Sequence, residues 1–170
     1  MRLTYLPLPM DERHRFLALA LALTALLLLP AGALATAKPA TFQVGAATKS
    51  IAPNAPVFAG GFGRYDALNA SQQHDPLQVK AFYVERGGKA VAFAVVDCQA
   101  WFAAYQEGPG YGIADARDAA AKAVGHGLSA DGIIVQGTHS HAAPTLEGIW
   151  GKVAPQYLKL VHDQTVAAIA

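Results

Sequence analysis

The stretch Leu77–Val96 reads LQVKAFYVERGGKAVAFAVV and decides the fold class. Along its first half, 77–85, successive side chains alternate between two faces, as they do in a β-strand. The turn segment 86–89 (RGGK) follows, and the apolar run 90–96 comes directly after it. The pattern predicts a β-hairpin, and the continuous apolar run predicts that its second strand is buried on both faces.

Predicted elements on both sides of this hairpin indicate an α/β domain. Residues 113–124 (IADARDAAAKAV) predict a helix, because acidic residues lie early, a lysine lies late and a glycine follows. The other predicted elements are a strand at 41–46, a Pro- and Gly-rich loop at 49–64, a strand at 132–136 and a helix at 154–170. Together they predict a mixed β-sheet with flanking helices.

The N-terminal segment is typical of an export signal. Three arginines precede the apolar run Phe16–Leu29, and small residues with two Ala-x-Ala patterns follow it. The run is short for a membrane-spanning helix, which needs about 20 apolar residues. We therefore predict a signal peptide at 1–37, a mature domain at 38–170 and a secreted or periplasmic location. An uncleaved membrane anchor is the alternative.

The composition excludes several classes of protein. The net charge is +1 with both signs interspersed, so the chain of 170 residues lacks the basic footprint of a nucleic-acid-binding protein. Because Cys98 is the only cysteine, no intramolecular disulfide forms. Cys98 ends an apolar run and is predicted to be a buried small hydrophobe. Such an exported domain depends on its core, on a metal or on further chain for stability.

Two histidines stand one residue apart after the strand predicted at 132–136. The segment Gly137–Pro144 reads GTHSHAAP and contains His139 and His141. On extended backbone both side chains point to the same side, and neutral imidazole suits zinc. The pair also ends an apolar strand, which is where open α/β sheets place their sites. An H-x-H pattern is weak evidence by itself, so incidental loop histidines are the alternative.

Three further residues are candidates around such a site. His74 lies just before the hairpin and is a third histidine that could bind a metal. Asp75 and Asp97 could each orient a ligand histidine, with a turn or a cap as the alternative role. The patterns of other hydrolases are missing from the sequence: no Asp-His follows the pair, and neither HExxH nor G-x-S-x-G occurs.

The segment Gly137–Pro144 resembles the G-T-H-T/S-H-x-x-P signature of the neutral/alkaline non-lysosomal ceramidases. The similarity spans about Phe42 to Trp150. Four other segments resemble the family in the same order: 49–53 (KSIAP), with Ser and Ala where the family has Asp and Thr, 59–63 (AGGFG), 74–82 (HDPLQVKAF) and 94–97 (AVVD). The ordered set is more specific than the H-x-H segment alone.

The resemblance implies a zinc-dependent amide hydrolase that splits ceramide into sphingosine and a fatty acid. In the family, zinc is held by two histidines, a glutamate and a tyrosine. By motif, His74 matches the first histidine ligand, and we assign His141 as the second. His139 is the alternative ligand, or a catalytic neighbour that contacts metal-bound water or substrate. Asp97 is the other catalytic candidate, through a ligand histidine that it orients.

In the family, the remaining ligands and a serine implicated in catalysis come from sequence far downstream. The sequence stops at Ala170 before any match to them, so we expect an incomplete catalytic domain that is inactive alone. The expected substrate is ceramide or a related N-acyl lipid, with peripheral contact to a lipid surface. Two alternatives stay open: a non-catalytic exported remnant or binding domain with part of the metal site, and a structural domain with incidental histidines. No oligomeric state is predicted.

Overall fold

The computed structural model describes Asp11 and residues 40–61, 67–68, 73–106 and 110–170. Apart from Asp11, the predicted signal peptide lies outside the described residues. The chain divides into two units, 1–39 and 40–170, and the second carries the helices and strands that follow. Within the described part of the chain, no helix is both long and apolar enough to cross a lipid bilayer.

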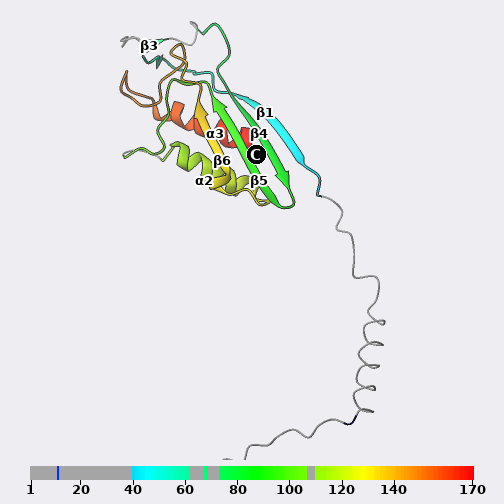
Figure 1. Cartoon of the computed structure of the whole chain (residues 1–170). Coiled ribbons are helices and arrows are strands. Elements are labelled where there is room, and N and C mark those ends of the chain that lie inside the picture. The colour runs from blue at the N-terminus through cyan, green and yellow to red at the C-terminus, as the bar shows by residue number, and fades with distance from the viewer. Residues whose placement is uncertain (1–10, 12–39, 62–66, 69–72, 107–109) are drawn as a thin grey trace, which may run out of the picture. The chain divides into compact units, whose positions relative to one another are not determined.

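Four strands of the second unit form a mixed β-sheet (Figure 1). They are β1 (Gln43–Ser50), β4 (Gln78–Arg86), β5 (Lys89–Val96) and β6 (Ile133–Gly137), in the order β1-β4-β5-β6. Strand β4 pairs antiparallel with β1 and β5, whereas β6 runs parallel to β5. These pairings confirm the predicted hairpin and the predicted mixed sheet.

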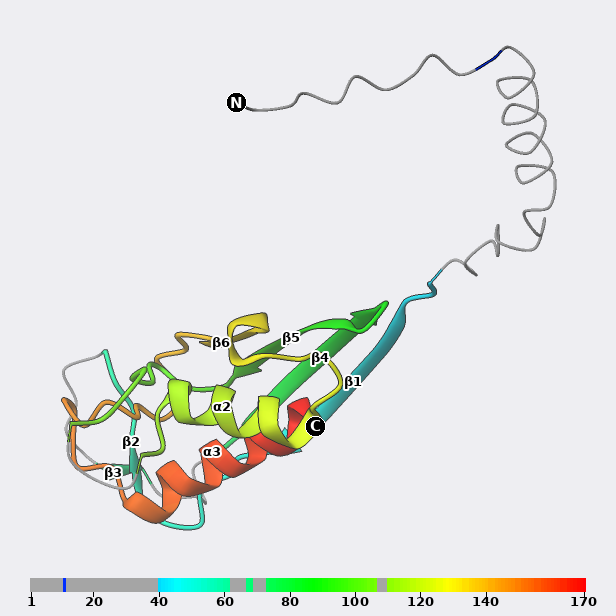
Figure 2. The ribbon, with the colours of Figure 1, turned by 90° about the horizontal axis from the view of Figure 1, so that it is seen from below.

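Two helices cover one face of this sheet (Figure 2). They are α2 (Ile113–Val124) and α3 (Pro155–Ile169), and a one-turn 3-10 helix, η3 (Ala130–Gly132), precedes β6. The hydrophobic core lies between the helices and the sheet. Its fully buried members include Val79, Ala94, Val96, Ala116, Ala120, Ile133 and Val161. Helix α2 packs on α3 and on β6, and α3 packs on β1, β4 and β5.

The ends of α2 follow the signals in the sequence. At the start, the Gly112 N–H donates a hydrogen bond to Asp115 Oδ2 over 2.9 Å. At the end, Gly125 adopts a φ of 63° and its N–H donates to the Ala121 carbonyl over 2.9 Å. Such a left-handed residue after the last turn is a common helix stop. The predicted bounds of this helix are confirmed.

The prediction of a Pro- and Gly-rich loop over the whole of 49–64 needs correction. Strand β1 extends to Ser50, which pairs with Gln78 of β4. Further along, β2 (Val57–Phe58) pairs antiparallel with β3 (Ala67–Leu68) in a separate two-stranded sheet. Two-residue strands among prolines and glycines show no alternating pattern in the sequence. Whether they form depends on pairing with another strand and not on local propensity.

The prediction that β5 is buried on both faces is wrong. On the helix-covered side, Ala92 and Val96 are 2% and 0% exposed. On the other side, Val91 and Phe93 are 56% and 41% exposed. Both helices lie on the first side, so the apolar run reflects one covered face and one uncovered face.

Candidate functional site

The loop after β6 begins at the edge of the sheet where the parallel strands β5 and β6 end together. Val96 pairs with Gly137, and the Thr138 N–H donates a hydrogen bond to the Val96 carbonyl over 2.9 Å. A Cβ atom at Gly137 would lie 3.0 Å from Cys98 Sγ, so glycine lets this strand end close to its neighbour. The histidines that follow are therefore carried at the carboxyl edge of both strands, where α/β sheets place ligand sites.

His139 is held in a fixed orientation by the loop after β5. Its Nδ1 atom lies 2.7 Å from the main-chain carbonyl oxygen of Gln99. Because a carbonyl only accepts, Nδ1 carries the proton and donates, which leaves the Nε2 lone pair available. The backbone of His139 has a φ of 57°, in the left-handed region that non-glycine residues rarely adopt. Strained positions of this kind occur often at functional sites.

His141 faces His139 across a short gap. The two Nε2 atoms are 3.5 Å apart, and the ring centroids are 5.0 Å apart with the ring planes at 80°. The sequence predicted extended backbone for both histidines. That prediction is wrong, because His139 has a left-handed backbone conformation. Their side chains converge because the chain turns between them.

The separation of the two Nε2 atoms matches that of two ligands of one zinc ion. Zinc binds imidazole nitrogen at about 2.0–2.1 Å in tetrahedral geometry, which puts two ligand atoms about 3.4 Å apart. The observed 3.5 Å is also at the outer limit of a hydrogen bond. Two neutral imidazoles are a donor set that suits zinc. We call His139 and His141 the histidine pair.

The structure does not place His74 in a metal-binding group with the histidine pair. The His74 side chain is 95% exposed, and its Nδ1 atom lies 3.3 Å from the Asp75 carboxylate. Among the residues that the structure describes, no three His, Cys, Asp or Glu side chains form a group that could hold a metal ion. The assignment of His74 as a ligand stays a prediction.

Asp97 lies at the same edge of the sheet, where it ties β5 to the start of β4. Its Oδ2 atom accepts a hydrogen bond from the Gln78 N–H over 3.0 Å, and its own N–H donates to the Gln78 carbonyl over 2.9 Å. This reciprocal contact is the capping role that the sequence analysis gave as the alternative for Asp97. A catalytic role for Asp97 stays a prediction.

Sequence reasoning missed the part that Gln99 plays in the site. The residue is only 8% exposed, and its main-chain carbonyl orients His139. Its buried side-chain atom Oε1 has no hydrogen-bond partner among the residues that the structure describes. A main-chain acceptor has no sequence signature, so only the fold reveals it.

The glycine pair Gly60-Gly61 brings the backbone against the site. A Cβ atom at Gly60 would lie 2.6 Å from the Trp150 ring and 2.8 Å from Gln99 Oε1. At Gly61, where φ is +92°, a Cβ atom would lie 2.0 Å from His141 Nδ1. Glycine at these two positions permits a backbone approach that a side chain would block. In the structure, the close approach is to His141 and to Gln99 with Trp150.

Two ionisable side chains in the core around this loop, Cys98 and Tyr105, stay neutral at physiological pH. Burial raises the pKa of the Cys98 thiol to about 12, with Asp97 and Glu147 contributing in the same direction. Burial also raises the pKa of Tyr105 to about 12, and its hydroxyl donates to the Leu146 carbonyl over 2.6 Å. The prediction that Cys98 is a buried small hydrophobe is confirmed by its 1% exposure.

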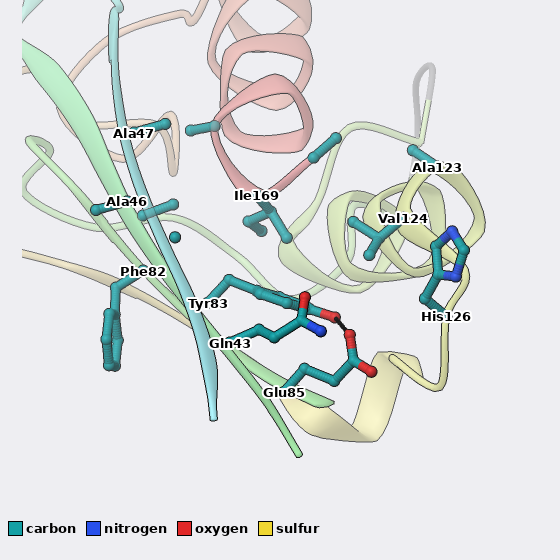
Figure 3. A pocket seen from close by; sticks show the side chains of 14 residues that line it. Gln43, Ala46, Ala47, Phe82, Tyr83, Glu85, Ala123, Val124, His126 and Ile169 are labelled. Carbon is teal, nitrogen blue, oxygen red and sulfur yellow. Dashed lines mark hydrogen bonds between the residues drawn. The ribbon is translucent and has the colours of Figure 1, made fainter. Parts of the chain in front are cut away.

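A cavity of about 640 Å³ lies at the other end of the sheet, at the end of β4 and the ends of both helices (Figure 3). The Tyr83 hydroxyl donates to Glu85 Oε2 over 3.1 Å there, and His126 and Ile169 also line the cavity. Desolvation first, and then Glu85, raises the pKa of Tyr83. Because β5 and β6 both end at the opposite edge, this cavity is separate from the histidine pair.

Comparison with solved structures identifies the fold. The chain is similar to neutral ceramidase from Pseudomonas aeruginosa, with a TM-score of 0.60, 17% sequence identity and coverage of 78% of this chain and 21% of that chain. It is also similar to a ceramidase described as complexed with C2, with a TM-score of 0.58, 17% identity and coverage of 76% and 20%. The sequence matches no protein-family model and no curated protein.

These likenesses confirm the ceramidase-like fold that the sequence resemblance implies. The chain spans about a fifth of the length of both ceramidase chains. At 17% identity the agreement concerns the fold, so activity, metal and substrate are argued separately from the residues of the site.

Proposed function

We propose that residues 40–170 supply the two-histidine part of the zinc centre of an amide hydrolase of the neutral ceramidase type. The observation that carries the proposal is the histidine pair. Its Nε2 atoms are 3.5 Å apart, and the Gln99 carbonyl fixes the tautomer of His139. Two imidazoles whose Nε2 atoms converge in this way are unusual as incidental loop residues, because such an arrangement costs conformational freedom.

Each residue around the pair has a stated part in this proposal. His141 and His139 hold zinc through their Nε2 atoms, and His74 is the further histidine ligand by motif. Zinc, when bound, supplies Lewis-acid activation of the amide carbonyl and of water. The Gln99 carbonyl holds the imidazole of His139 in one tautomer, as partners of metal-ligating histidines commonly do. If His141 alone holds the ion, Nε2 of His139 can accept a proton or a hydrogen bond from water or substrate.

The substrate class and the location belong to the same proposal. An N-acyl lipid such as ceramide is the proposed substrate, because the motif set resembles ceramidases and the fold is ceramidase-like. From the signal-like N-terminal segment we also propose that the protein is exported and meets this lipid at a membrane surface. The described residues contribute part of the metal site, so hydrolysis requires ligands beyond the histidine pair.

Zinc-dependent hydrolysis with the histidine variants tests the proposal. The protein isolated from its native source should release fatty acid from an N-acylsphingosine, lose this activity with a chelator and regain it with zinc. His141→Ala and His139→Ala should each lower the rate by roughly 10- to 100-fold or more, because each removes a ligand or its partner. Zinc content, measured by elemental mass spectrometry, should fall with the rate.

The matched control is His126→Ala, which removes an exposed histidine at the other end of the sheet. This variant should keep both its zinc and its rate of fatty-acid release. Hydrolysis that survives zinc removal, or full activity in His141→Ala, would contradict the proposal.

A further inference from the structure

Gln99 contacts the loop of the histidine pair through two main-chain atoms. Its carbonyl oxygen accepts from His139 Nδ1 over 2.7 Å, and its N–H donates to the Pro144 carbonyl over 2.9 Å. The carbonyl of the next residue, Ala100, accepts from the Leu146 N–H over 2.9 Å. These hydrogen bonds hold the backbone at Gln99 against the loop, so the carbonyl that orients His139 does not depend on the Gln99 side chain.

The side chain of Gln99 lies against the glycine pair Gly60-Gly61. A Cβ atom at Gly60 would lie 2.8 Å from Gln99 Oε1, so the amide is next to the backbone of this glycine. The preceding residue, Ala59, forms an antiparallel β-bridge with Pro144, which keeps Gly60 close to the histidine loop. The Gln99 side chain and the glycine pair therefore pack together beside the loop.

Gly61 extends this packing to His141. The atoms nearest to a Cβ at Gly61 would be Nδ1, Cε1 and Cγ of the His141 ring. The backbone of Gly61 thus supports the ring at its Nδ1 edge, whereas the Nε2 atom faces His139. Because Gly60 and Gly61 are adjacent in the chain, the place of the His141 ring depends on the side chains that pack behind Gly60, and Gln99 is one of them.

The contribution of the Gln99 side chain at this place is volume. The residue is 8% exposed, and its Oε1 atom is buried without a hydrogen-bond partner in the parts of the chain that the structure describes. Replacing an unpartnered buried polar group by an apolar group of the same shape is commonly neutral or stabilising. An apolar side chain of similar length should therefore support Gly60 as well as glutamine does.

We propose that Gln99 is a positioning residue for both members of the histidine pair. Its main-chain carbonyl orients His139, and its side chain, packed behind Gly60-Gly61, keeps the His141 ring in place. The purpose of this arrangement rests on the proposed zinc centre, but the arrangement itself belongs to the metal-free protein. A substitution at Gln99 changes the side chain and leaves the carbonyl, so the two roles can be separated.

Nitrogen-15 NMR of the imidazole rings in the metal-free full chain tests this division of roles. In Gln99→Ala, His139 should keep its proton on Nδ1, because the carbonyl that accepts it is still present. The His141 ring should lose its nuclear Overhauser contact with the α-protons of Gly61, and its nitrogen shifts should change. Zinc affinity, measured by calorimetry on the same variant, should fall roughly tenfold, as for other partners of metal-ligating histidines.

Two further variants keep the test decisive. Gln99→Met restores the length of the side chain without the amide, and it should restore the His141 contact and a zinc affinity close to that of the wild type. If Gln99→Ala does not fold, Gln99→Asn is a milder truncation that should change the His141 signals in the same direction. Gln136→Ala is the matched control, because Gln136 is exposed on β6 just before the histidine loop, and it should change neither ring.

Three results would overturn the proposal. They are an unchanged His141 ring in both truncations of Gln99, loss of the His139 tautomer together with the His141 contact, and a Gln99→Met variant that behaves like Gln99→Ala. Failure of the zinc centre would look different. The ring signals would then change as expected in Gln99→Ala, while neither this variant nor the wild type bound zinc, so the positioning role would be supported and the proposed metal site would not.

Discussion

Gly61→Ala is expected to weaken zinc binding roughly 10- to 100-fold while the domain stays folded. A Cβ atom at this position would lie 2.0 Å from Nδ1 and 2.2 Å from Cε1 of His141, and the backbone has a φ of +92°. Alanine is strained at this φ, and the methyl group cannot share the space of the imidazole ring. If the ring moves, Nε2 of His141 shifts away from Nε2 of His139; if the loop moves, His141 loses the backbone that packs against its ring. A tenfold loss of affinity corresponds to about 1.4 kcal/mol.

Zinc titration followed by calorimetry measures this effect. Gly45→Ala is the matched control, because a Cβ atom at Gly45 in β1 would meet nothing within 4 Å. It should leave zinc affinity unchanged. If Gly61→Ala binds zinc as tightly as the wild type, the close approach of this loop to His141 has no part in positioning the metal.

Leu146→Ala is expected to lower the free energy of unfolding by about 2–5 kcal/mol, as for other large-to-small core substitutions. Leu146 is 0% exposed, its N–H donates to the Ala100 carbonyl over 2.9 Å, and its own carbonyl accepts from Tyr105. The side chain therefore fixes the segment after the histidine pair to the core. Truncation leaves a cavity that the surrounding backbone, held by these hydrogen bonds, cannot close.

Urea unfolding followed by circular dichroism tests this prediction against a neighbouring control. Ile149→Ala removes an apolar side chain that is 62% exposed, three residues further along, and should change the stability by less than about 0.5 kcal/mol. Equal effects of the two substitutions would show that Leu146 does not lie in the core as described.

Local sequence patterns predicted the hairpin and α2 well because both elements are specified by neighbours in the chain. The turn at Gly87-Gly88 joins β4 to β5, and the acidic start and glycine stop bound α2. Which face of a sheet is covered depends on helices from other parts of the chain. The run 90–96 therefore could not reveal that the face with Val91 and Phe93 is exposed. The same limit applied to β2, whose pairing with β3 is not specified by its own two residues.

The candidate site was predictable in its residues and not in its geometry. The H-x-H pattern identified His139 and His141, but extended backbone was the wrong reason for their convergence, because His139 is left-handed. The carbonyl that orients His139 belongs to Gln99, which is 40 positions away in the chain. Only the pairing of β5 with β6 brings the two loops together.

X-ray absorption at the zinc edge tests the central claim most directly. We expect the zinc-loaded protein to show histidine imidazoles bound through nitrogen at about 2.0–2.1 Å, those of the histidine pair among them. The double variant His139→Ala/His141→Ala should lose most of the imidazole scattering together with most of the bound zinc. A wild-type spectrum without imidazole ligands, or an unchanged spectrum in the double variant, would contradict the account that the histidine pair holds the metal.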